Sequence, residues 1–294
     1  MRSGMVAVVG RPNVGKSSLV NALVGRKVSI TSHKPQTTRH RIQGVLHGDN
    51  AQVVFVDTPG LHLKAERALN RAMNDAASGA MHDVDLILFV IEAGRFNDED
   101  KAVLEKLALV TAPVALIINK VDKYADKEDL LPELAQRTAL RDFAFVMPLS
   151  ATKKDNLDAL ATTLLARMAE GDPLYPEDMV VGHGQAFAAA ETIREKLVRN
   201  LHEEMPYSTS VEIESFEEDG RLIRISAIIW VERPGQKAIV IGKEGETLKQ
   251  IGSNARRDLE RSLGRKVFLK LWCKVRENWS DDPKALAQFG YLGE

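Results

Sequence analysis

The chain has 294 residues, of which 44% are hydrophobic and 28% charged, and a formal net charge of −1. Its length suits two domains, and the longest apolar runs, Leu86–Ile91 and Pro113–Ile118, are far too short to span a bilayer. The single cysteine, Cys273, excludes an internal disulfide and CxxC metal sites. We therefore expect a soluble globular protein with a reduced, buried thiol.

The first 172 residues alternate apolar runs with stretches of helical period. Strands are predicted at Met5–Val9, Ile42–His47, Gln52–Val56, Leu86–Ile91, Val114–Ile118 and Phe145–Leu149. Helices such as Lys101–Leu109 and Leu157–Met168 are predicted between most of them. This order predicts an α/β domain with a mostly parallel sheet and helices on both faces, and the turn at residues 47–50 predicts one antiparallel hairpin.

The alternation stops at residues 173–182, a polar, proline-containing stretch that we interpret as a linker. Beyond it we predict a helix at 184–203, strands at 210–216 and 222–231, two helices broken at 242–245, and a strand at 266–275. This α-β-β-α-α-β order predicts a smaller α+β domain over residues 183–294.

A phosphate-binding pattern, G-x4-G-K-[ST], lies between a predicted strand and a helix that starts near Ser17. Glycines let the backbone wrap around phosphate oxygens with its N–H groups pointing inward. Lys16 would reach the β- and γ-phosphates, and the Ser17 hydroxyl would ligate Mg²⁺. The nucleotide-binding residues expected here are Gly10, Asn13, Val14, Gly15, Lys16, Ser17 and Ser18.

Asp-Thr-Pro-Gly follows the strand that ends at Val56. Asp57 would hold Mg²⁺ through water, and the Gly60 amide would sense the γ-phosphate. The same four residue types are also common in tight turns, so this motif alone does not establish a nucleotide site.

Asn-Lys-Val-Asp follows the strand that ends at Ile118. A carboxylate there can accept two hydrogen bonds from guanine, a donor pair that adenine lacks. A backbone N–H after the next strand can donate to guanine O6. The residues expected to bind the base are Asn119, Lys120, Asp122, Ser150 and Ala151. Since open α/β sheets bind ligands at the carboxyl ends of their strands, the four motifs together predict a GTP site.

This combination resembles the translation-factor-related branch of the P-loop GTPases. The resemblance implies that Thr37 and Thr38 lie in the first switch segment, with Thr38 completing the Mg²⁺ shell. Lys16, Thr38 and Gly60 are the residues that we expect to assist hydrolysis.

Leucine replaces the glutamine with which many small GTPases orient the attacking water. Leu61 cannot position water by hydrogen bonding, so another group must assist the reaction. In several relatives an asparagine at the position of Asn13 helps to hold K⁺ beside the transferred phosphate, and a purely structural role in the loop is the alternative. His62 as a base is a less favoured hypothesis than a surface histidine.

A GxxG loop, Gly242–Gly245, separates the two helices predicted in the second domain. From Lys237 to Arg276 there are eleven Lys or Arg against four Asp or Glu, although an ordinary solvated face could carry the same charge. The element order and the basic excess resemble the bacterial, type II KH domain, whose loop approaches about four nucleotides. The expected RNA-binding residues are Lys237, Ile241, Gly242, Lys243, Glu244, Gly245, Lys249, Arg256 and Arg257.

Over its full length the chain resembles the bacterial KH-domain GTPases of small ribosomal subunit assembly. The resemblance rests on the phosphate loop, on Gln36–Arg41, on the Asp57 and Asn119 motifs, on the KH loop and on a tail between Asn278 and Tyr291. It implies a cytoplasmic GTPase that binds 16S ribosomal RNA near its 3′ end and assists 30S maturation. GTP would favour RNA binding and hydrolysis would promote release.

Three alternatives stay open at this point. The chain could be a scaffold that binds GTP without hydrolysing it, or a tRNA-modifying GTPase, although no added catalytic domain is evident. It could also be a membrane-associated regulator of the cell cycle or stress response. Such a protein would be peripheral at the inner face of the cell membrane and would bind anionic lipid through its basic KH surface. A monomer is the default expectation.

Overall fold

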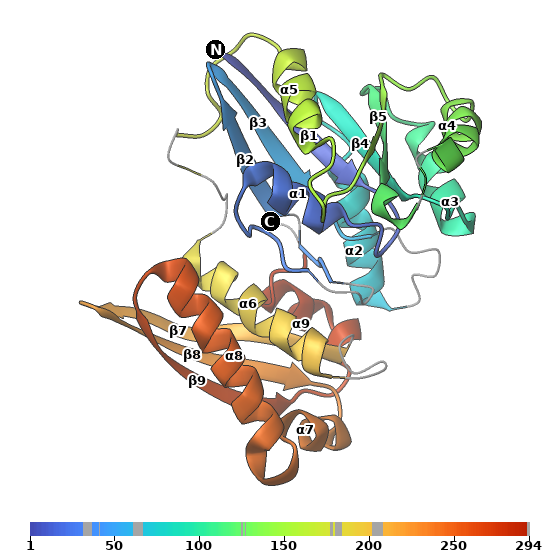
Figure 1. Cartoon of the computed structure of the whole chain (residues 1–294). Coiled ribbons are helices and arrows are strands. Elements are labelled where there is room, and N and C mark those ends of the chain that lie inside the picture. The colour runs from blue at the N-terminus through green and yellow to red at the C-terminus, as the bar shows by residue number, and fades with distance from the viewer. Residues whose placement is uncertain are drawn as a thin grey trace. The chain divides into compact units, whose positions relative to one another are not determined.

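The computed structural model describes residues 1–31, 37–40, 42–60, 67–124, 126, 128–176, 179, 184–201 and 208–292. The chain divides into two compact units (Figure 1). One comprises Met1–Glu66 and Asn70–Gly182, and the other comprises Arg67–Leu69 and His183–Glu294. None of the helices described is both long and apolar enough to cross a bilayer.

The first unit is built on a six-stranded sheet in the order β2-β3-β1-β4-β5-β6. All neighbouring pairs are parallel except β2 and β3, which form the hairpin expected from the turn after His47. The strands are β1 (Arg2–Val9), β2 (Ile42–Gly48), β3 (Ala51–Asp57), β4 (Leu86–Glu92), β5 (Val114–Asn119) and β6 (Val146–Leu149). The α/β architecture predicted from the sequence is therefore confirmed.

Helices cover both faces of this sheet, and each face has its own apolar core. Leucines of α1 (Lys16–Val24) and α5 (Leu157–Arg167) pack with Val6, Val8 and Phe55 on one face. On the other face, side chains of three helices pack with Ala7, Val9 and Ile87. These helices are α2 (Ala68–Gly79), α3 (Asp98–Leu107) and α4 (Leu131–Thr138). The short 3-10 helices η1 (Val121–Lys123) and η2 (Glu128–Leu130) precede α4.

Helix α3 begins three residues before the predicted start at Lys101. Asn97 accepts hydrogen bonds from the Glu99 and Asp100 amides at 3.1 and 3.2 Å, and Asp100 accepts one from the Asn97 amide at 3.1 Å. This capping box fixes the start of the helix because it satisfies amide groups that have no partner inside the helix.

The first half of the predicted linker is bound to the sheet. Gln52, which is fully buried, accepts hydrogen bonds from the amides of Leu174 and Tyr175, each at 3.0 Å, and donates to the Tyr175 carbonyl at 2.8 Å. The Tyr175 hydroxyl donates to Gln43 on β2. This segment is therefore held by the two strands on either side of the hairpin turn.

The second unit contains a three-stranded sheet in the order β7-β8-β9, with β7 antiparallel and β9 parallel to β8. The strands are β7 (Thr209–Asp219), β8 (Leu222–Val231) and β9 (Lys266–Val275). Figure 1 shows α6 (Gln185–Asn200) and α8 (Glu246–Leu263) lying across one face of the sheet. The described residues of this unit also form α7 (Pro234–Ile241), η4 (Lys243–Gly245), η5 (Trp279–Asp281) and α9 (Pro283–Gln288). The α-β-β-α-α-β order agrees with the sequence prediction.

Candidate nucleotide-binding site and KH loop

The phosphate loop joins β1 to α1. Gly15 precedes the helix with φ of 101°, and a Cβ at this position would lie 2.3 Å from Asn119 Nδ2, so the close approach requires glycine. Lys16 is buried and its ammonium donates to the carbonyls of Gly10 and Arg11, both at 3.0 Å. Burial lowers the Lys16 pKa to about 8, although Asp57 opposes this shift. A phosphate in the loop would bring this buried cation a second negative partner.

Ser17, Thr38 and Asp57 come together beside the loop. Thr38 Oγ1 lies 2.8 Å from Ser17 Oγ and 3.4 Å from Asp57 Oδ2. Asp57 is fully buried, and within the described chain its Oδ1 has no hydrogen-bond partner. Burial raises the pKa of the Asp57 carboxyl, against the opposing effects of the Lys16 charge and of neighbouring hydroxyls. Two hydroxyls and a carboxylate with an unused oxygen are the hard donors that suit Mg²⁺.

Gly60 lies against the phosphate loop. The preceding turn is anchored by Thr58, whose hydroxyl donates to the Val8 carbonyl of β1 at 2.8 Å. A Cβ on Gly60 would lie 2.8 Å from the Pro12 nitrogen, so the Asp57–Gly60 segment packs closely on the loop. Leu61 and His62, which bear on the hydrolysis mechanism, lie outside the described residues, as do Gln36 and Arg41.

Asn119 connects the expected guanine site to the phosphate loop. Its Nδ2 donates to the Val14 carbonyl at 2.9 Å, and its Oδ1 accepts from the Lys120 and Ala151 amides at 2.8 and 3.1 Å. The Lys120 ammonium donates to the Asn13 carbonyl at 2.6 Å. The three segments are thus joined by hydrogen bonds. Ser150 and Ala151 form the pair from which a backbone N–H was expected to donate to guanine O6, and here the Ala151 amide donates to Asn119.

Asp122 lies in η1 with its side chain exposed at the same edge of the sheet. Its carboxylate accepts a hydrogen bond from the hydroxyl of Ser150, which also accepts one from the Lys153 amide at 3.1 Å. The four motifs predicted from the sequence are therefore assembled where the parallel strands end.

Sequence reasoning missed a buried ion-pair cluster behind the loop. Arg11, only 3% exposed, pairs through Nε with Asp100 at 2.9 Å and through Nη2 with Glu92 at 3.0 Å. Glu92 also pairs with Lys120 at 3.3 Å and with Lys123. Burial raises the pKa of Glu92, but hydrogen bonds from Lys123 and Arg11 and the charge of Lys120 outweigh it and bring the pKa to about 2. The cluster fixes the phosphate loop and the guanine motif to β4.

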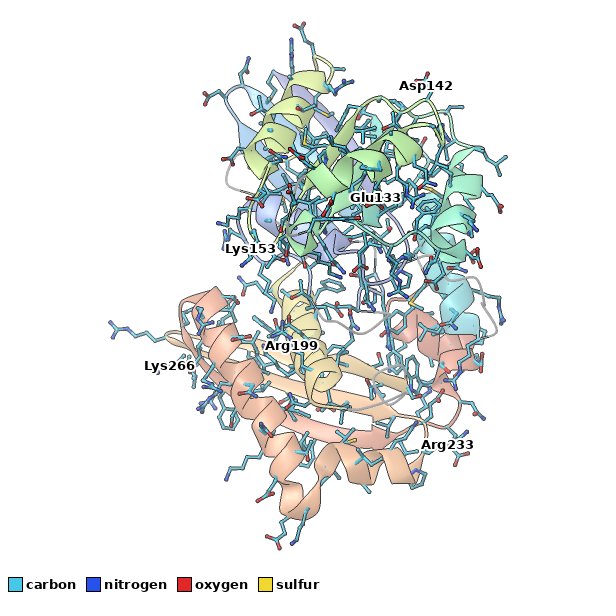
Figure 2. All side chains as sticks on the ribbon, turned by 45° about the vertical axis from the view of Figure 1, so that its right-hand side comes forward. Glu133, Asp142, Lys153, Arg199, Arg233 and Lys266 are labelled. Atoms are coloured by element: carbon cyan, nitrogen blue, oxygen red, sulfur yellow. The ribbon has the colours of Figure 1, made fainter. Side chains whose placement is uncertain are left out.

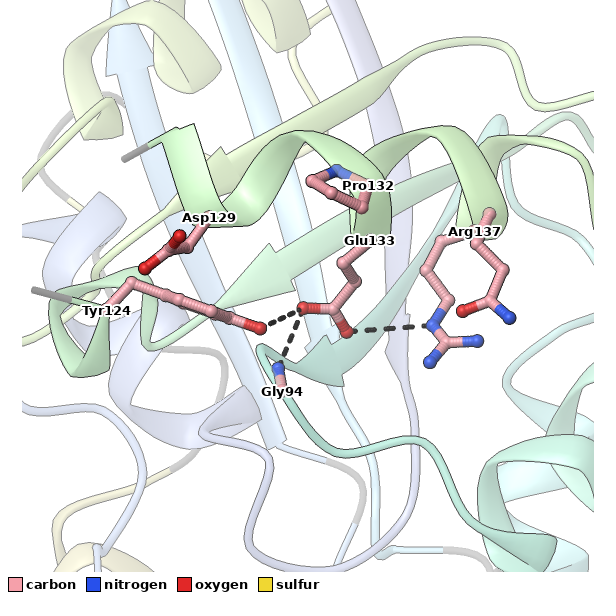
Figure 3. A pocket seen from close by; sticks show the side chains of 7 residues that line it. Gly94, Tyr124, Asp129, Pro132, Glu133 and Arg137 are labelled. Atoms are coloured by element: carbon pink, nitrogen blue, oxygen red, sulfur yellow. Dashed lines mark hydrogen bonds and ion pairs between the residues drawn. The ribbon is translucent and has the colours of Figure 1, made fainter. Parts of the chain in front are cut away.

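A hollow of about 550 Å³ lies in the first unit, lined in part by Gly94, Tyr124, Glu133 and Arg137 (Figure 3). Glu133 accepts hydrogen bonds from the Gly94 amide at 2.8 Å and from the Tyr124 hydroxyl at 3.0 Å, and Arg137 lies 3.6 Å from its other oxygen. Since Tyr124 follows the guanine motif by two residues, Glu133 ties that segment to α4. These contacts hold Tyr124 and Gly94 against α4.

The predicted KH loop connects α7 to α8 through η4. Gly242 ends α7 with φ of 75°, and a Cβ there would lie 2.2 Å from Thr247 Oγ1 and 2.9 Å from the Thr247 amide. Gly245 precedes α8 with φ of 82°, and a Cβ at this position would have nothing within 4 Å. Lys243 and Glu244 are exposed at the tip of the loop. The first glycine is therefore required by close packing, and the tip is available to a ligand.

The basic residues expected around this loop lie on two helices, α7 and α8. Lys237 is on α7, and Lys249, Arg256 and Arg257 are on α8 with exposed side chains. Arg257 hydrogen-bonds Asn254 and lines a hollow of about 380 Å³ between α6 and α8, together with Arg199. Figure 2 labels Arg199 on α6.

The apolar side chains around the loop divide into core and surface, and Ile241, expected to bind RNA, packs against the core. Val240 and Ile251 are buried, Ile241 and Leu248 pack against the same core, and Ile239 is 53% exposed. Cys273 is buried in this core, and burial raises the pKa of its thiol to about 11.

Comparison with known proteins agrees with both units. Residues 5–120 match the model of the 50S ribosome-binding GTPase family, and residues 204–280 match that of the KH domain. GTPase Era of Xanthomonas oryzae pv. oryzae is 55% identical over 290 residues, 99% of this chain and 97% of the relative. GTPase Era of Stenotrophomonas maltophilia is 55% identical over 288 residues, 98% of this chain and 97% of the relative.

Two solved structures match over nearly the whole chain, each with 39% identity. A variant of Aquifex aeolicus Era bound to GDP·AlF4⁻ gives a TM-score of 0.95. The match covers 99% of this chain and 100% of that structure's chain. Era in complex with MgGDPNP and nucleotides 1506–1542 of 16S ribosomal RNA gives a TM-score of 0.96, with 99% of each chain covered. The chain belongs to the Era family of GTPases.

Proposed function

We propose that the chain hydrolyses GTP in its first unit and binds 16S ribosomal RNA near its 3′ end through its KH domain, assisting assembly of the small ribosomal subunit. The observation that carries this proposal is the presence, in one chain, of the assembled phosphate and guanine motifs and of a KH loop with an exposed tip. A relative 39% identical has been solved with a GTP analogue and this part of the RNA together.

The hydrolytic site would be built on the buried Lys16 and on the group formed by Ser17, Thr38 and Asp57. Ser17 and Thr38 would ligate Mg²⁺ directly and Asp57 through water, and the unused Asp57 oxygen supports that assignment. The bound ion would supply positive charge for the phosphates. Lys16 would turn from the loop carbonyls to the β- and γ-phosphates, and the Gly60 amide would donate to the γ-phosphate.

Asn13 would help to hold K⁺ beside the transferred phosphate. Its side chain is exposed at the loop, and its backbone has φ of 65°, a conformation that asparagine tolerates better than most residues. Hydrolysis should then be faster in K⁺ than in Na⁺ at equal ionic strength, and Asn13→Ala should remove the difference. Equal rates of the unchanged protein in both salts would exclude the role.

We assign the GTP-binding domain to residues 1–172, the linker to 173–182 and the KH domain with its tail to 183–294. The bonds from Gln52 to Leu174 and Tyr175 support a linker whose first part follows the hairpin of the GTP-binding domain. Since β2 follows the segment that contains Thr38, a nucleotide-dependent change there can reach the linker through Gln43 and Tyr175. We take the protein to act as a cytoplasmic monomer.

A multiple-turnover phosphate-release assay, with and without an RNA copied from the 16S 3′ end, tests the proposed activity. We expect several turnovers per protein molecule in the presence of Mg²⁺ and none from Lys16→Ala. Binding of GTP without turnover in either condition would instead identify a scaffold.

A further inference from the structure

One face of the KH sheet carries a row of exposed rings and lysines along β9. Side chains alternate between the two faces of a strand, and Val267, Leu269, Leu271 and Cys273 face the helices and the core. The residues between them therefore point to the opposite face. These are Lys266, Phe268, Lys270, Trp272 and Lys274, all exposed.

The two rings are exposed to an extent unusual for their size. Phe268 is 52% exposed and Trp272 is 48% exposed, whereas the other tryptophan near the tail, Trp279, is fully buried. Four residues of strand separate the rings by about 13 Å, with Lys270 between them. The Lys270 ammonium lies 5.1 Å from the centre of the Trp272 ring, so a cation accompanies this ring.

The described part of the C-terminal segment packs against Trp230 and Glu212 on this face. Phe289 lies 6.1 Å from Trp230 between ring centres, and Gln288 donates to Glu212 at 2.9 Å. Trp230 also donates to Glu212 at 2.7 Å. Among the described residues, Phe268 and Trp272 each keep about half of their residue surface exposed.

Charge is separated across the face. The register pairs Arg224 of β8 with Phe268 of β9 and with Glu217 of β7, so all three lie on the same side. The same side carries Glu212 and Asp219 on β7, while β9 contributes only lysines and rings. A polyanion would therefore be drawn to the β9 half and repelled from the β7 half.

We propose that the row from Lys266 to Trp272 is a second surface for single-stranded RNA, distinct from the Gly242–Gly245 loop. Unpaired bases stack on Phe268 and Trp272, and Lys266 and Lys270 neutralise the adjoining phosphates. This inference rests on the proposed RNA-binding function and extends it to RNA longer than the loop alone can hold. Lys266, at the start of the row, is labelled in Figure 2.

Protection of an exposed sheet edge does not account for the row. Lysines on an edge strand discourage pairing with another sheet, and β9 is an edge strand. Half-exposed phenylalanine and tryptophan would instead promote association with other molecules, because exposed apolar surface favours aggregation. The alternation of rings with cations instead matches the combination that binds single strands.

The test compares two single-stranded RNAs in the full chain with a non-hydrolysable GTP analogue and Mg²⁺. One has about four nucleotides, enough for a KH loop, and the other about twelve. The double variant Phe268→Ala with Trp272→Ala should bind the longer RNA at least tenfold more weakly and the shorter one as before. Phe268→Tyr with Trp272→Phe, which keeps both rings, should restore the affinity. Lys270→Gln should reduce the slope of log affinity against log salt by about 0.7 for the longer RNA.

Leu109→Ala with Leu131→Ala is the matched control, because these side chains are 85% and 61% exposed on the other unit. It should leave both affinities unchanged. If the variant without the two rings binds the longer RNA with unchanged affinity, the proposal of a second RNA-binding surface is wrong. RNA binding by the KH loop is tested separately, because the double variant Lys243→Asp with Glu244→Asp should lose binding of the short RNA. If the rings matter only for binding to vesicles of anionic phospholipid, the surface is a membrane contact and the proposal is wrong.

Discussion

Asn119 Nδ2 donates to the Val14 carbonyl across 2.9 Å, which ties the guanine motif to the phosphate loop. The same side chain accepts hydrogen bonds from the amides of Lys120 and Ala151. A single buried amide therefore holds together three of the four segments that form the nucleotide site.

Replacing Asn119 by alanine should weaken GTP and GDP alike. The change leaves a buried carbonyl and two amide donors without their partner, at about 1–3 kcal/mol for each group that water cannot reach. We expect at least a tenfold loss of affinity for both nucleotides by calorimetry, and a lower melting temperature. Asn254→Ala, in the second unit, should change neither, and a loss confined to GTP would contradict the positioning role.

The affinity for GTP should fall as pH rises above about 8. Burial lowers the Lys16 pKa to about 8 in the free protein, and a bound phosphate would raise it, so binding takes up a proton once Lys16 has lost its own. The slope of log affinity against pH should approach −1 above pH 8. Lys16→Arg, which stays protonated, should lack this component. Identical pH profiles of the two proteins would contradict a role for the lysine charge.

Asp57→Asn should separate folding from Mg²⁺ binding. Burial raises the Asp57 pKa, so the ionised form is disfavoured in the folded protein and its contribution to stability declines as pH rises. At neutral pH the neutral amide removes that cost, and the nucleotide-free variant should melt no lower than the unchanged protein. Its stabilisation by GTP with Mg²⁺ should be lost. A variant that still gains full stabilisation would show that Asp57 is not needed for the ion.

Glu92 should stabilise the fold down to low pH. Its pKa of about 2 lies below the ordinary value of 4.5, so the stabilisation by its ionised form is complete above pH 4.5 and disappears as pH falls towards 2. The difference in unfolding free energy between the unchanged protein and Glu92→Gln should shrink over that range, by up to ~3 kcal/mol. Glu105→Gln, at an exposed position, is the control. A difference that stays constant with pH would contradict the ion-pair cluster.

The strands and the nucleotide motifs could be predicted because their information is local. Strands β8 and β9 begin and end at the predicted residues. The residues expected to bind phosphate lie close together in the sequence, between Gly10 and Ser17. The periodicity of its apolar residues does not locate the start of α3, because the Asn97 cap sets that start.

Other features depend on residues far apart in the chain. Arg11 meets partners 81 and 89 positions away, and Gln52 binds a segment more than 120 positions later. Neither pairing leaves a local pattern. The exposure of Phe268 and Trp272 likewise depends on which face of the sheet the helices cover.

The most direct test of the central claim is the affinity for single-stranded RNA copied from the 16S 3′ end, measured with a non-hydrolysable GTP analogue and with GDP in K⁺ buffer at fixed salt. Lys243→Asp with Glu244→Asp is the control, since it adds negative charge at the loop tip without straining Gly242. We expect clearly tighter binding with the analogue, and loss of that binding in the control with GTP affinity kept. Equal affinity in the two nucleotide states would contradict control of RNA binding by GTP.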